Sequence, residues 1–592
     1  TQNKLQKVDL ISILSSKFLK AAVFSNDSTC LVIPVDREVP SEEVDLEEAV
    51  DKFSKISFIT QIFVLSWRAI HLSIVQGFRR HIRLQQNISH WQRQAEQANE
   101  ANRLTANNNV DQLIAIRLAT EVMLMKPDLL VDSYTLLLAG TDLMLKLLKS
   151  EVGDNKPFDL KKLDMNSVLF RVPEHLIEDI IEFTQFISMF DPKFFKANFF
   201  SLEPIMTLIV FLLANPNLVR SPHLRAKLGD LVYYTFLPEN KLNSSFGEPH
   251  TTLLYSHPSA QESLAPSLLL LYGDVEHTGY YDKLEHRYHI AVVLKYLWKN
   301  EEHRSTFRRI SEDTDQFVRF ANGLMNESNA LVASVMEKLP EIRSIQLQQN
   351  DATKWTLLSE ERQNEMVERL NEAERAVTSN LLLCNETLDM VNYLTSDVYI
   401  QIPFLLPELL ARLASMLLSI IGQLVGKKGL EIKVQNPEKY NFRPKEMLAS
   451  VIGVVSHFAS NGETFDTAIA TSGFYQRDLL SKALATVQKH GLMDFKKLKE
   501  LENLCQRVQL VYEKVNSMDE RLGDVPEEFL CPLMCTVMKD PVLLPTSGNI
   551  IDRSTIIQHL LNDPTDPFNR KPLDPSMLVP QVDLKARIGE YL

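Results

Sequence analysis

The sequence is poor in cysteine. Its 592 residues contain five, and these are scattered along the chain at Cys30, Cys384, Cys505, Cys531 and Cys535. Small secreted domains that depend on disulfides carry denser and more regular cysteine spacings, so this scarcity indicates a reducing compartment. We therefore expect a cytoplasmic and nuclear protein.

An excess of basic charge and the common nucleotide-binding motifs are also missing. The formal net charge is −13, with 63 Lys and Arg residues against 76 Asp and Glu residues. A body that binds nucleic acid usually presents a basic surface, so we expect no nucleic-acid partner. The chain shows no Walker-type phosphate loop, dinucleotide fingerprint or zincin motif, and we expect no ATP chemistry within it.

No uninterrupted hydrophobic run of membrane-spanning character stands out. The most apolar candidate, residues 58–75, is interrupted by Arg68 and His71, which favours a buried core helix and no membrane partner. The first residues, Thr1-Gln-Asn-Lys, contain neither an initiator Met nor a signal-peptide pattern. We expect the numbering to begin inside a longer natural protein.

Glycine is scarce, with 18 residues, and helical periodicity fills most of the chain. Leu176, Ile180, Phe183 and Ile187 follow a 4-3-4 spacing after Pro173, which suits the first turn of a helix. Similar apolar stripes include residues 360–394 and 496–515. No strict period of the tetratricopeptide or ankyrin kind appears. Paired helices of unequal length predict a mostly α fold, an elongated irregular α-solenoid like armadillo or HEAT repeats.

The last stretch of the chain has a different character. Proline residues interrupt its short apolar runs, which excludes one long helix. Residues 542–551 predict a strand, a tight turn and a second strand, with Gly548 supplying the positive φ that such a turn needs. Asp552 is a suitable N-cap for a helix reaching about Asn562, and Asp583 can begin a final helix.

A domain of roughly 70 residues is marginal on hydrophobic burial alone and often needs a metal or disulfides. Here Cys531, Cys535 and His559 are the only soft metal ligands. Two tetrahedral zinc sites need about eight such ligands, so we expect no metal and no cofactor. The polar side chains available in place of a metal are those of Ser547, Asp552, Asp566, Asn569 and Arg570.

Residues 524–592 resemble the U-box family, a zinc-free relative of RING ubiquitin-transfer modules. The resemblance is carried by Val525-Pro-Glu-Glu-Phe-Leu-Cys-Pro-Leu-Met, Met538-Lys-Asp-Pro-Val-Leu-Leu-Pro, Ile551-Asp-Arg-Ser-Thr-Ile and Asp566-Pro-Phe-Asn-Arg-Lys-Pro-Leu. It implies a small α+β domain in which hydrogen bonds and ion pairs of Ser547, Asp552, Asp566 and Asn569 replace the metals.

The same resemblance implies a function for a second set of residues. A U-box docks a ubiquitin-conjugating enzyme that carries ubiquitin as a thioester, and it forms no covalent intermediate itself. By position in the motif, Leu533, Cys535, His559 and Pro567 would contact the conjugating enzyme. Arg570 matches the linchpin position, where a planar guanidinium can donate to the enzyme and to ubiquitin together. Such positioning of a reactant can accelerate attack on the thioester.

Residues 1–523 carry a second resemblance. The runs Asn215-Pro-Asn-Leu-Val-Arg-Ser-Pro-His-Leu-Arg-Ala-Lys-Leu, Gly279-Tyr-Tyr-Asp-Lys and Asn436-Pro-Glu-Lys-Tyr-Asn-Phe-Arg-Pro-Lys look like the core of the ubiquitin conjugation factors that elongate ubiquitin chains. This resemblance implies ubiquitin and ubiquitylated substrates as partners. It also implies the AAA+ segregase valosin-containing protein, proteasome shuttle factors and a role in proteasomal degradation.

Two other interpretations stay open from the sequence. The first is a helical scaffold that binds clients or the segregase, with a U-box used only for docking. The second makes Cys531 or Cys535 a catalytic thiol that accepts ubiquitin, although no His–Asn or His–Asp pattern accompanies them. Cys535 also departs from the family, since many U-boxes carry a larger apolar side chain there, which would retune the choice of conjugating enzyme.

Three further segments carry weaker signals. The polar residues 516–524 predict a short hinge before the U-box, and the Gln- and Asn-rich residues 92–112 predict a helix end followed by a loop. The acidic residues 38–51 predict a solvated loop that leads into a helix. His286 and His289 are spaced for one helix face, but they match no metal motif and are expected to be structural.

Overall fold

A computed structural model describes residues 7–15, 30–32, 56–97, 100–153, 163, 167–238, 249–275, 279–425, 437–522, 525–561 and 563–591. The acidic segment 38–51 lies outside the described residues. The chain forms two compact units, Thr1–Thr306 and Phe307–Leu592. Helices dominate both units, so the prediction of a mostly α protein is confirmed.

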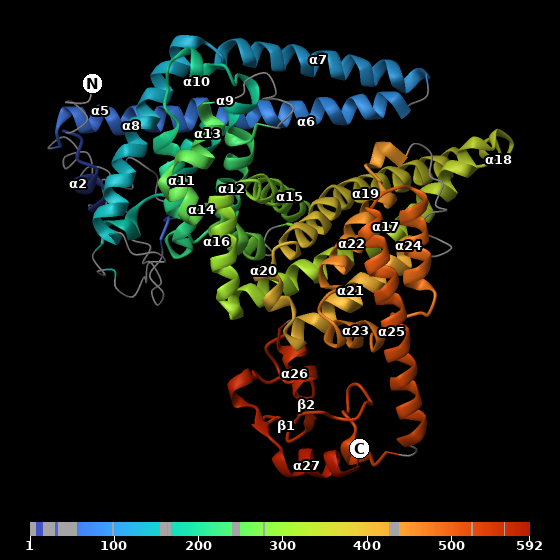
Figure 1. Cartoon of the computed structure of the whole chain (residues 1–592). Coiled ribbons are helices and arrows are strands. Elements are labelled where there is room, and N and C mark those ends of the chain that lie inside the picture. Colours follow the sequence, from blue (N-terminus) through green and yellow to red (C-terminus); the bar gives the residue numbers. More distant parts are fainter. Residues whose placement is uncertain are drawn as a thin grey trace. The chain divides into compact units, whose positions relative to one another are not determined.

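Helices make up most of the described part of the first unit (Figure 1). Proline opens several of them at the first helical position, where its missing N–H costs nothing. The elements are α2 (Leu10–Ser15), α5 (Phe58–Ile70), the π-helix η1 (His71–Val75), α6 (Gln76–Gln97), α7 (Glu100–Leu124), α8 (Pro127–Val152), η3 (Val168–Arg171), α9 (His175–Phe190), α10 (Phe194–Ala197), α11 (Glu203–Ala214), η4 (Pro216–Leu218), α12 (Pro222–Phe236), α13 (Pro249–Ser256), α14 (Pro258–Asp274), α15 (Tyr280–Leu297) and α16 (Glu301–Glu312), which runs on into the second unit.

Helix α6 packs along α7, and together they correct one sequence prediction. The Gln- and Asn-rich residues 92–112 were predicted to form a helix end and a loop, yet α7 already begins at Glu100. Polar composition here marks a solvated helix face, because helices tolerate Gln and Asn wherever packing holds the other face.

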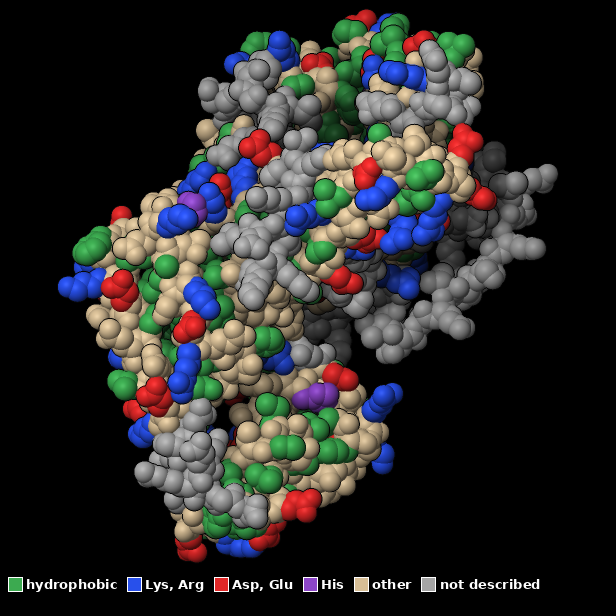
Figure 2. Space-filling model, turned by 90° about the vertical axis from the view of Figure 1, so that its right-hand side faces the viewer, with side chains coloured by type: hydrophobic (Ala, Val, Ile, Leu, Met, Phe, Trp, Pro, Cys, Tyr) green, Lys and Arg blue, Asp and Glu red, His purple; other side chains and the backbone are tan. Residues whose placement is uncertain are grey.

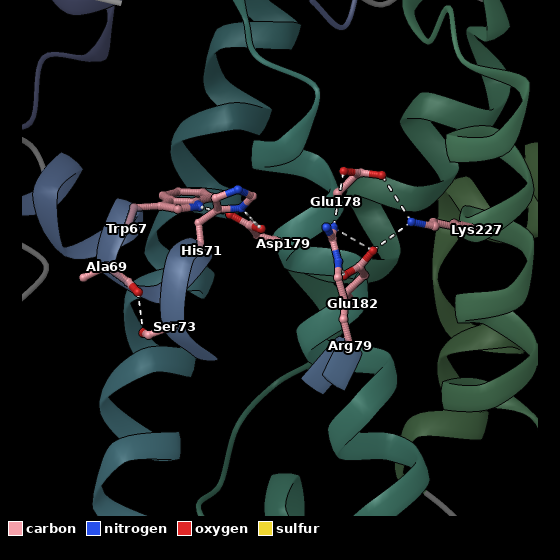
Figure 3. Close-up of polar contacts among 9 residues, drawn as sticks. All are labelled: Trp67, Ala69, His71, Ser73, Arg79, Glu178, Asp179, Glu182 and Lys227. Atoms are coloured by element: carbon pink, nitrogen blue, oxygen red, sulfur yellow. Dashed lines mark hydrogen bonds and ion pairs between the residues drawn. The ribbon is translucent and has the colours of Figure 1, made fainter. Parts of the chain in front are cut away.

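A buried carboxylate ties the π-helix of the first unit to α9 (Figure 3). Asp179 is fully buried and accepts hydrogen bonds from Trp67 Nε1 at 3.0 Å and from His71 Nδ1 at 2.7 Å. Burial raises the pKa of Asp179, and these two donors offset part of that effect. The hydrogen bond with Asp179 in turn raises the pKa of His71. The neighbouring Arg79, Glu182 and Lys227 form a second ionic group, which joins α6, α9 and α12.

His286 and His289 of α15 both face Asp230 of α12. Their Nδ1 atoms lie 2.8 and 2.7 Å from its two carboxylate oxygens, and all three residues are buried. Burial raises the pKa of Asp230, but the close contacts with the two histidines outweigh it and hold that pKa below its usual value. The prediction that these histidines are structural agrees with this placement, since they join two packed helices.

The second unit begins with two long helices, α17 (Thr314–Asn350) and α19 (Glu360–Thr395), which pack side by side. Ser359 caps α19 by accepting a hydrogen bond from the Arg362 N–H at 3.3 Å. The predicted stripe 360–394 therefore coincides with a helix. The remaining helical elements of this body are α18 (Ala352–Thr356), α20 (Val398–Phe404), α21 (Pro407–Val425), η6 (Pro437–Tyr440), α22 (Pro444–Phe458), α23 (Glu463–Ala470), α24 (Leu479–Lys489) and α25 (Phe495–Leu522).

Helix α25 corrects the predicted hinge. It runs without interruption to Leu522, through most of the polar segment 516–524, while residues 523 and 524 lie outside the described part of the chain. The polar residues there continue a helix whose earlier turns are fixed by packing against α23 and α24. Polarity alone therefore does not predict a break in a helix that is already anchored.

Among the described residues, two helical stretches are long and apolar enough to cross a membrane by length and composition alone. They are Phe58–Ala95 and Pro407–Val425, and 39% and 61% of their most apolar windows are buried in the protein. Core helices of soluble proteins pass the same test. The prediction of a buried core helix at residues 58–75 holds for one face only, because Trp67 is buried whereas Phe58 and Leu72 are exposed.

Charges of both signs are interspersed over the described surface in Figure 2, with no wide area of Lys and Arg on that face. This distribution matches the acidic net charge of −13. A mixed surface gives little long-range attraction for a polyanion.

Candidate functional site: the C-terminal U-box

The C-terminal domain is built around a small sheet and one short helix. The sheet order is β2-β1-β3, with both pairs antiparallel, and Val542 of β1 pairs with Ile551 of β2. The predicted hairpin and central helix are confirmed, whereas β3 was not predicted. The elements are η7 (Glu527–Phe529), β1 (Pro541–Leu543), β2 (Ile550–Asp552), α26 (Arg553–Leu560), η8 (Pro575–Met577), β3 (Val579–Pro580) and α27 (Val582–Tyr591).

One apolar cluster forms the core of this domain. Cys531, Val542, Leu544, Ile551 and Ile556 are fully buried within it. They come from the segment before the hairpin, from β1, the hairpin turn and β2, and from α26, so these parts share one interior. Such a small core supplies only part of the stability that the domain needs, which makes its polar contacts important.

Asp552 joins the hairpin to the central helix. Its side chain accepts hydrogen bonds from the backbone N–H groups of Lys539 at 2.6 Å and Asp540 at 3.0 Å. Its other oxygen caps α26 by accepting from the backbone N–H and the hydroxyl of Ser554, at 3.0 and 2.6 Å. Four donors converge on one buried carboxylate, so it links two segments that are separated in the sequence.

Three loops of the domain share one backbone design. In each, the first residue accepts from the N–H four residues later and donates to the carbonyl five residues later, and all six distances are 2.8 Å. The fifth residue of each loop has a positive φ. We name them the first loop (residues 531–536), the hairpin loop (residues 544–549) and the second loop (residues 566–571).

The positive φ falls on Gly548 in the hairpin loop, but on Cys535 and Arg570 in the other two, with φ of 77°, 53° and 59°. Glycine adopts this conformation freely, while a residue with Cβ is disfavoured by about 1–2 kcal/mol. Cys535 and Arg570 were both predicted as site residues. Their backbones are held in a disfavoured conformation by the doubly hydrogen-bonded loops, which is typical of functional positions.

The second loop is tied to the hairpin loop through Asp566, which is fully buried. Its carboxylate accepts from the Thr546 hydroxyl and from the backbone N–H of Phe568 at 2.9 Å. Burial raises the pKa of Asp566, but these hydrogen bonds outweigh it and hold that pKa below its usual value. Asn569 Nδ2 adds a bond of 2.7 Å to the Thr546 carbonyl.

The predicted polar residues therefore lie in two networks, and Thr546 joins the predicted members. Asp552 serves the hairpin and α26, while Asp566 and Asn569 serve the two loops. Ser547 was predicted to take part, and it lies close enough to Asp566 to help lower the pKa of that carboxyl, although its hydroxyl meets no partner among the described residues at standard hydrogen-bond geometry. The neighbouring Thr546, which was not predicted, supplies the hydroxyl hydrogen bond to Asp566.

His559 connects the central helix to the second loop. Its Nε2 lies 2.9 Å from the carbonyl oxygen of Thr565, directly before Asp566. Pro567, which directly follows Asp566, is half-buried. The histidine thus fixes the distance between α26 and the loop that carries Pro567 and Arg570.

The tips of the first and second loops expose apolar side chains. Leu533 is 44% exposed and Phe568 is 39% exposed, and Met534 and Cys535 are exposed as well. Arg570 is also exposed at the end of the second loop. Met534 and Phe568 were missed by sequence reasoning, although both directly follow predicted contact residues. The two loops therefore expose apolar side chains, and the second also exposes a cation.

The two cysteines of this domain differ in surroundings. Cys531 is fully buried, and its Sγ lies 3.9 Å from the Thr555 hydroxyl, whereas Cys535 is exposed. Within the described part of the chain, no group of three or more His, Cys, Asp or Glu residues is arranged to hold a metal ion. The core position of Cys531 suits a small apolar side chain better than a nucleophile.

A three-stranded sheet, a capped central helix and loops braced by hydrogen bonds define a U-box domain, and the U-box family profile matches residues 525–592. The profile described as the ubiquitin elongating factor core matches residues 1–509. The chain belongs to the family of ubiquitin elongating factors with a C-terminal U-box.

Individual relatives agree with this assignment. The chain is 34% identical over 430 residues to "Probable ubiquitin conjugation factor E4" of Arabidopsis thaliana, covering 71% of this chain and 40% of that protein. It is 32% identical over 427 residues to "E4 ubiquitin-protein ligase UFD2" of Saccharomyces cerevisiae, covering 70% and 44%. It is 26% identical over 591 residues to "Ubiquitin conjugation factor E4 A" of Rattus norvegicus, covering 95% and 53%. The chain thus spans about half the length of these relatives.

Proposed function

We propose that this chain is a ubiquitin-protein transferase of the U-box type that elongates ubiquitin chains. The observation that carries the proposal is the pair of braced loops, which expose Leu533 on the first loop and both Phe568 and Arg570 on the second. Membership of the elongating-factor family and the likeness to a yeast protein named as a ubiquitin-protein ligase support it.

In this proposal the loops receive a conjugating enzyme charged with ubiquitin. Leu533 and Pro567 make apolar contact with it, and Cys535 and His559 flank that contact. Arg570 donates hydrogen bonds to carbonyl groups of the enzyme and of ubiquitin, which holds the flexible conjugate in one orientation. The amine of an acceptor lysine then attacks the thioester carbonyl, an isopeptide bond forms, and the thiolate of the conjugating enzyme leaves. The gain is one of orientation, since the U-box contributes no covalent step.

The helical residues 1–523 would then act as the body that holds the acceptor. We propose an elongated, irregular solenoid of armadillo- or HEAT-like helix pairs, supported by the packing of α17 along α19 and of α11 along α14. Its proposed partners are ubiquitylated substrates, the AAA+ segregase and proteasome shuttle factors. Proteasomal degradation in the cytoplasm and nucleus is the proposed setting.

A lysine-discharge assay tests the transferase. A ubiquitin-charged conjugating enzyme would be mixed with free lysine and with the full chain, either wild type or Arg570→Ala. We expect stimulation by the wild type, a loss of at least tenfold in Arg570→Ala, and no effect of a chelator. Arg587→Ala is the matched control, because Arg587 is an exposed arginine of α27 that pairs with Glu528 in the same domain. It should discharge like the wild type.

The opposite result would favour a different class of function. If the wild type stimulated no conjugating enzyme in a broad panel, the transferase proposal would fail. The chain would then be better described as a helical scaffold that binds clients or the segregase, with a U-box that only docks.

A further inference from the structure

One arginine of α21 forms a hydrogen bond that links the helical body to the U-box. Both elements lie within the second compact unit, and α21 packs against α26. Arg412, in the first half of α21, is half-buried and reaches in two directions. One guanidinium nitrogen donates to Asn322 Oδ1 of α17, and another donates to the Gln558 carbonyl oxygen of α26.

The chemistry of this contact favours an anchor. Gln558 lies in the last turn of α26, where carbonyl groups lack a full set of partners within the helix and the helix dipole is negative. A guanidinium is always charged and offers several donors in a fixed plane, so it can hold two acceptors at once. Asn322 is itself 3% exposed, which fixes the other end of the contact in the core of the body.

The contact leads directly to the proposed docking site. The next residue after Gln558 is His559, which reaches the carbonyl oxygen of Thr565 at 2.9 Å. Thr565 directly precedes the second loop, and Arg570 lies five residues after it. Three hydrogen bonds and the adjoining backbone therefore connect α17, through Arg412 and α26, with the loop that carries Arg570.

A contact between the body and the U-box could either inhibit docking or position the U-box, and the exposure of the loop tips distinguishes these roles. An inhibitory contact would cover the docking surface, yet Leu533 and Phe568 remain 44% and 39% exposed and Arg570 is exposed. The contact reaches α26 through a backbone carbonyl and leaves these side chains accessible. It therefore restrains the domain without closing its surface.

We infer that Arg412 is a positioning residue that orients the U-box on the helical body so that a docked conjugating enzyme faces the acceptor held by that body. This inference rests on the proposed function. The positioning role predicts different effects on discharge to free lysine and on chain extension. Free lysine diffuses to the thioester from any direction, whereas an acceptor held by the body requires a fixed orientation of the U-box.

The test uses the full chain with Arg412→Met, which keeps much of the side-chain volume and removes both hydrogen bonds. We expect discharge to free lysine within twofold of wild type, but at least a fivefold loss in chain extension on a ubiquitin-fusion substrate. Hydrogen exchange of residues 553–560 should become at least fivefold faster. Asn322→Ala removes the hydrogen bond between the guanidinium and α17. It should also lower chain extension and speed up exchange of residues 553–560, but by smaller factors than Arg412→Met does.

Arg308→Met is the matched control. Arg308 is also a half-buried arginine, and it binds Asp397 at 2.8 Å in the helical body. This variant should leave exchange in residues 553–560 and chain extension as in the wild type.

The outcomes separate the inference from the proposed function. Unchanged exchange in residues 553–560 in both Arg412→Met and Asn322→Ala would refute the anchor. Faster exchange with undiminished chain extension would refute the positioning role. If the wild type failed to discharge lysine at all, the proposed function would fail, while the exchange measurement would still decide whether Arg412 anchors the U-box.

Discussion

Replacing Asp552 by Ala is expected to destabilise the U-box strongly while the helical body keeps its stability. The substitution removes the N-cap of α26, which costs about 1 kcal/mol. It also leaves the backbone N–H groups of Lys539 and Asp540 without their acceptor, at about 1 kcal/mol each at the low end for part-buried donors. The total is about 3 kcal/mol, a large part of the few kcal/mol that a domain of this size has.

The chain contains a matched control for this prediction. Asp574 begins the same Asp-x-Ser pattern and accepts from the backbone N–H and the hydroxyl of Ser576 at 2.9 and 2.6 Å. Unlike Asp552 it is exposed, and it serves only this local turn. If burial and the long-range bonds matter as argued, Asp574→Ala should behave as an ordinary surface substitution.

Hydrogen exchange of the full chain measures the difference. In Asp552→Ala, exchange across residues 525–591 should be faster by about 100-fold, the equivalent of about 3 kcal/mol at 1.4 kcal/mol per tenfold change. Exchange in α17 and α19 should be unaltered. Equal effects of Asp552→Ala and Asp574→Ala would show that the carboxylate contributes only its local cap, and the reasoning would be refuted.

Two further predictions concern backbone strain and pH. Cys535→Asn should stabilise the U-box by about 0.5–1 kcal/mol because Asn tolerates positive φ, whereas Cys535→Val should destabilise it by about 1 kcal/mol or more; slower exchange in the Val variant would contradict this. Burial lowers the pKa of His457 to about 4, so its folded-state pKa lies below the unfolded value of 6.5. The contribution of neutral His457 to the free energy of unfolding is therefore fully present above pH 6.5. It is lost as the pH drops towards 4, because the histidine takes up a proton in the unfolded chain before it does so in the folded one. For this half-buried group the loss is about 1–2 kcal/mol. The urea midpoint of His457→Gln should therefore depend less on pH between 7 and 4 than that of the wild type, and parallel pH curves would show that His457 does not contribute.

The local elements of the fold could be predicted because they depend on neighbouring residues. Asp552 and Gly548 marked the start of α26 and the turn of the hairpin, and the apolar stripe 360–394 marked α19. The predictions of a loop and of a hinge failed because they relied on polar composition alone. Residues 92–112 and 516–522 are polar, yet they are largely helical, because tertiary packing of adjacent turns extends a helix through residues of modest propensity.

The sequence by itself determined that the chain is mostly helical, that residues 524–592 form a U-box, and which loop residues are candidates for docking. Only the tertiary structure decided which polar groups meet. Asp179 bonds a residue 108 positions away, Thr546 donates to Asp566, and Arg412 reaches a carbonyl 146 positions away. Periodicity and capping report on a few neighbouring residues, whereas the partner of a buried charge is set by how distant helices pack.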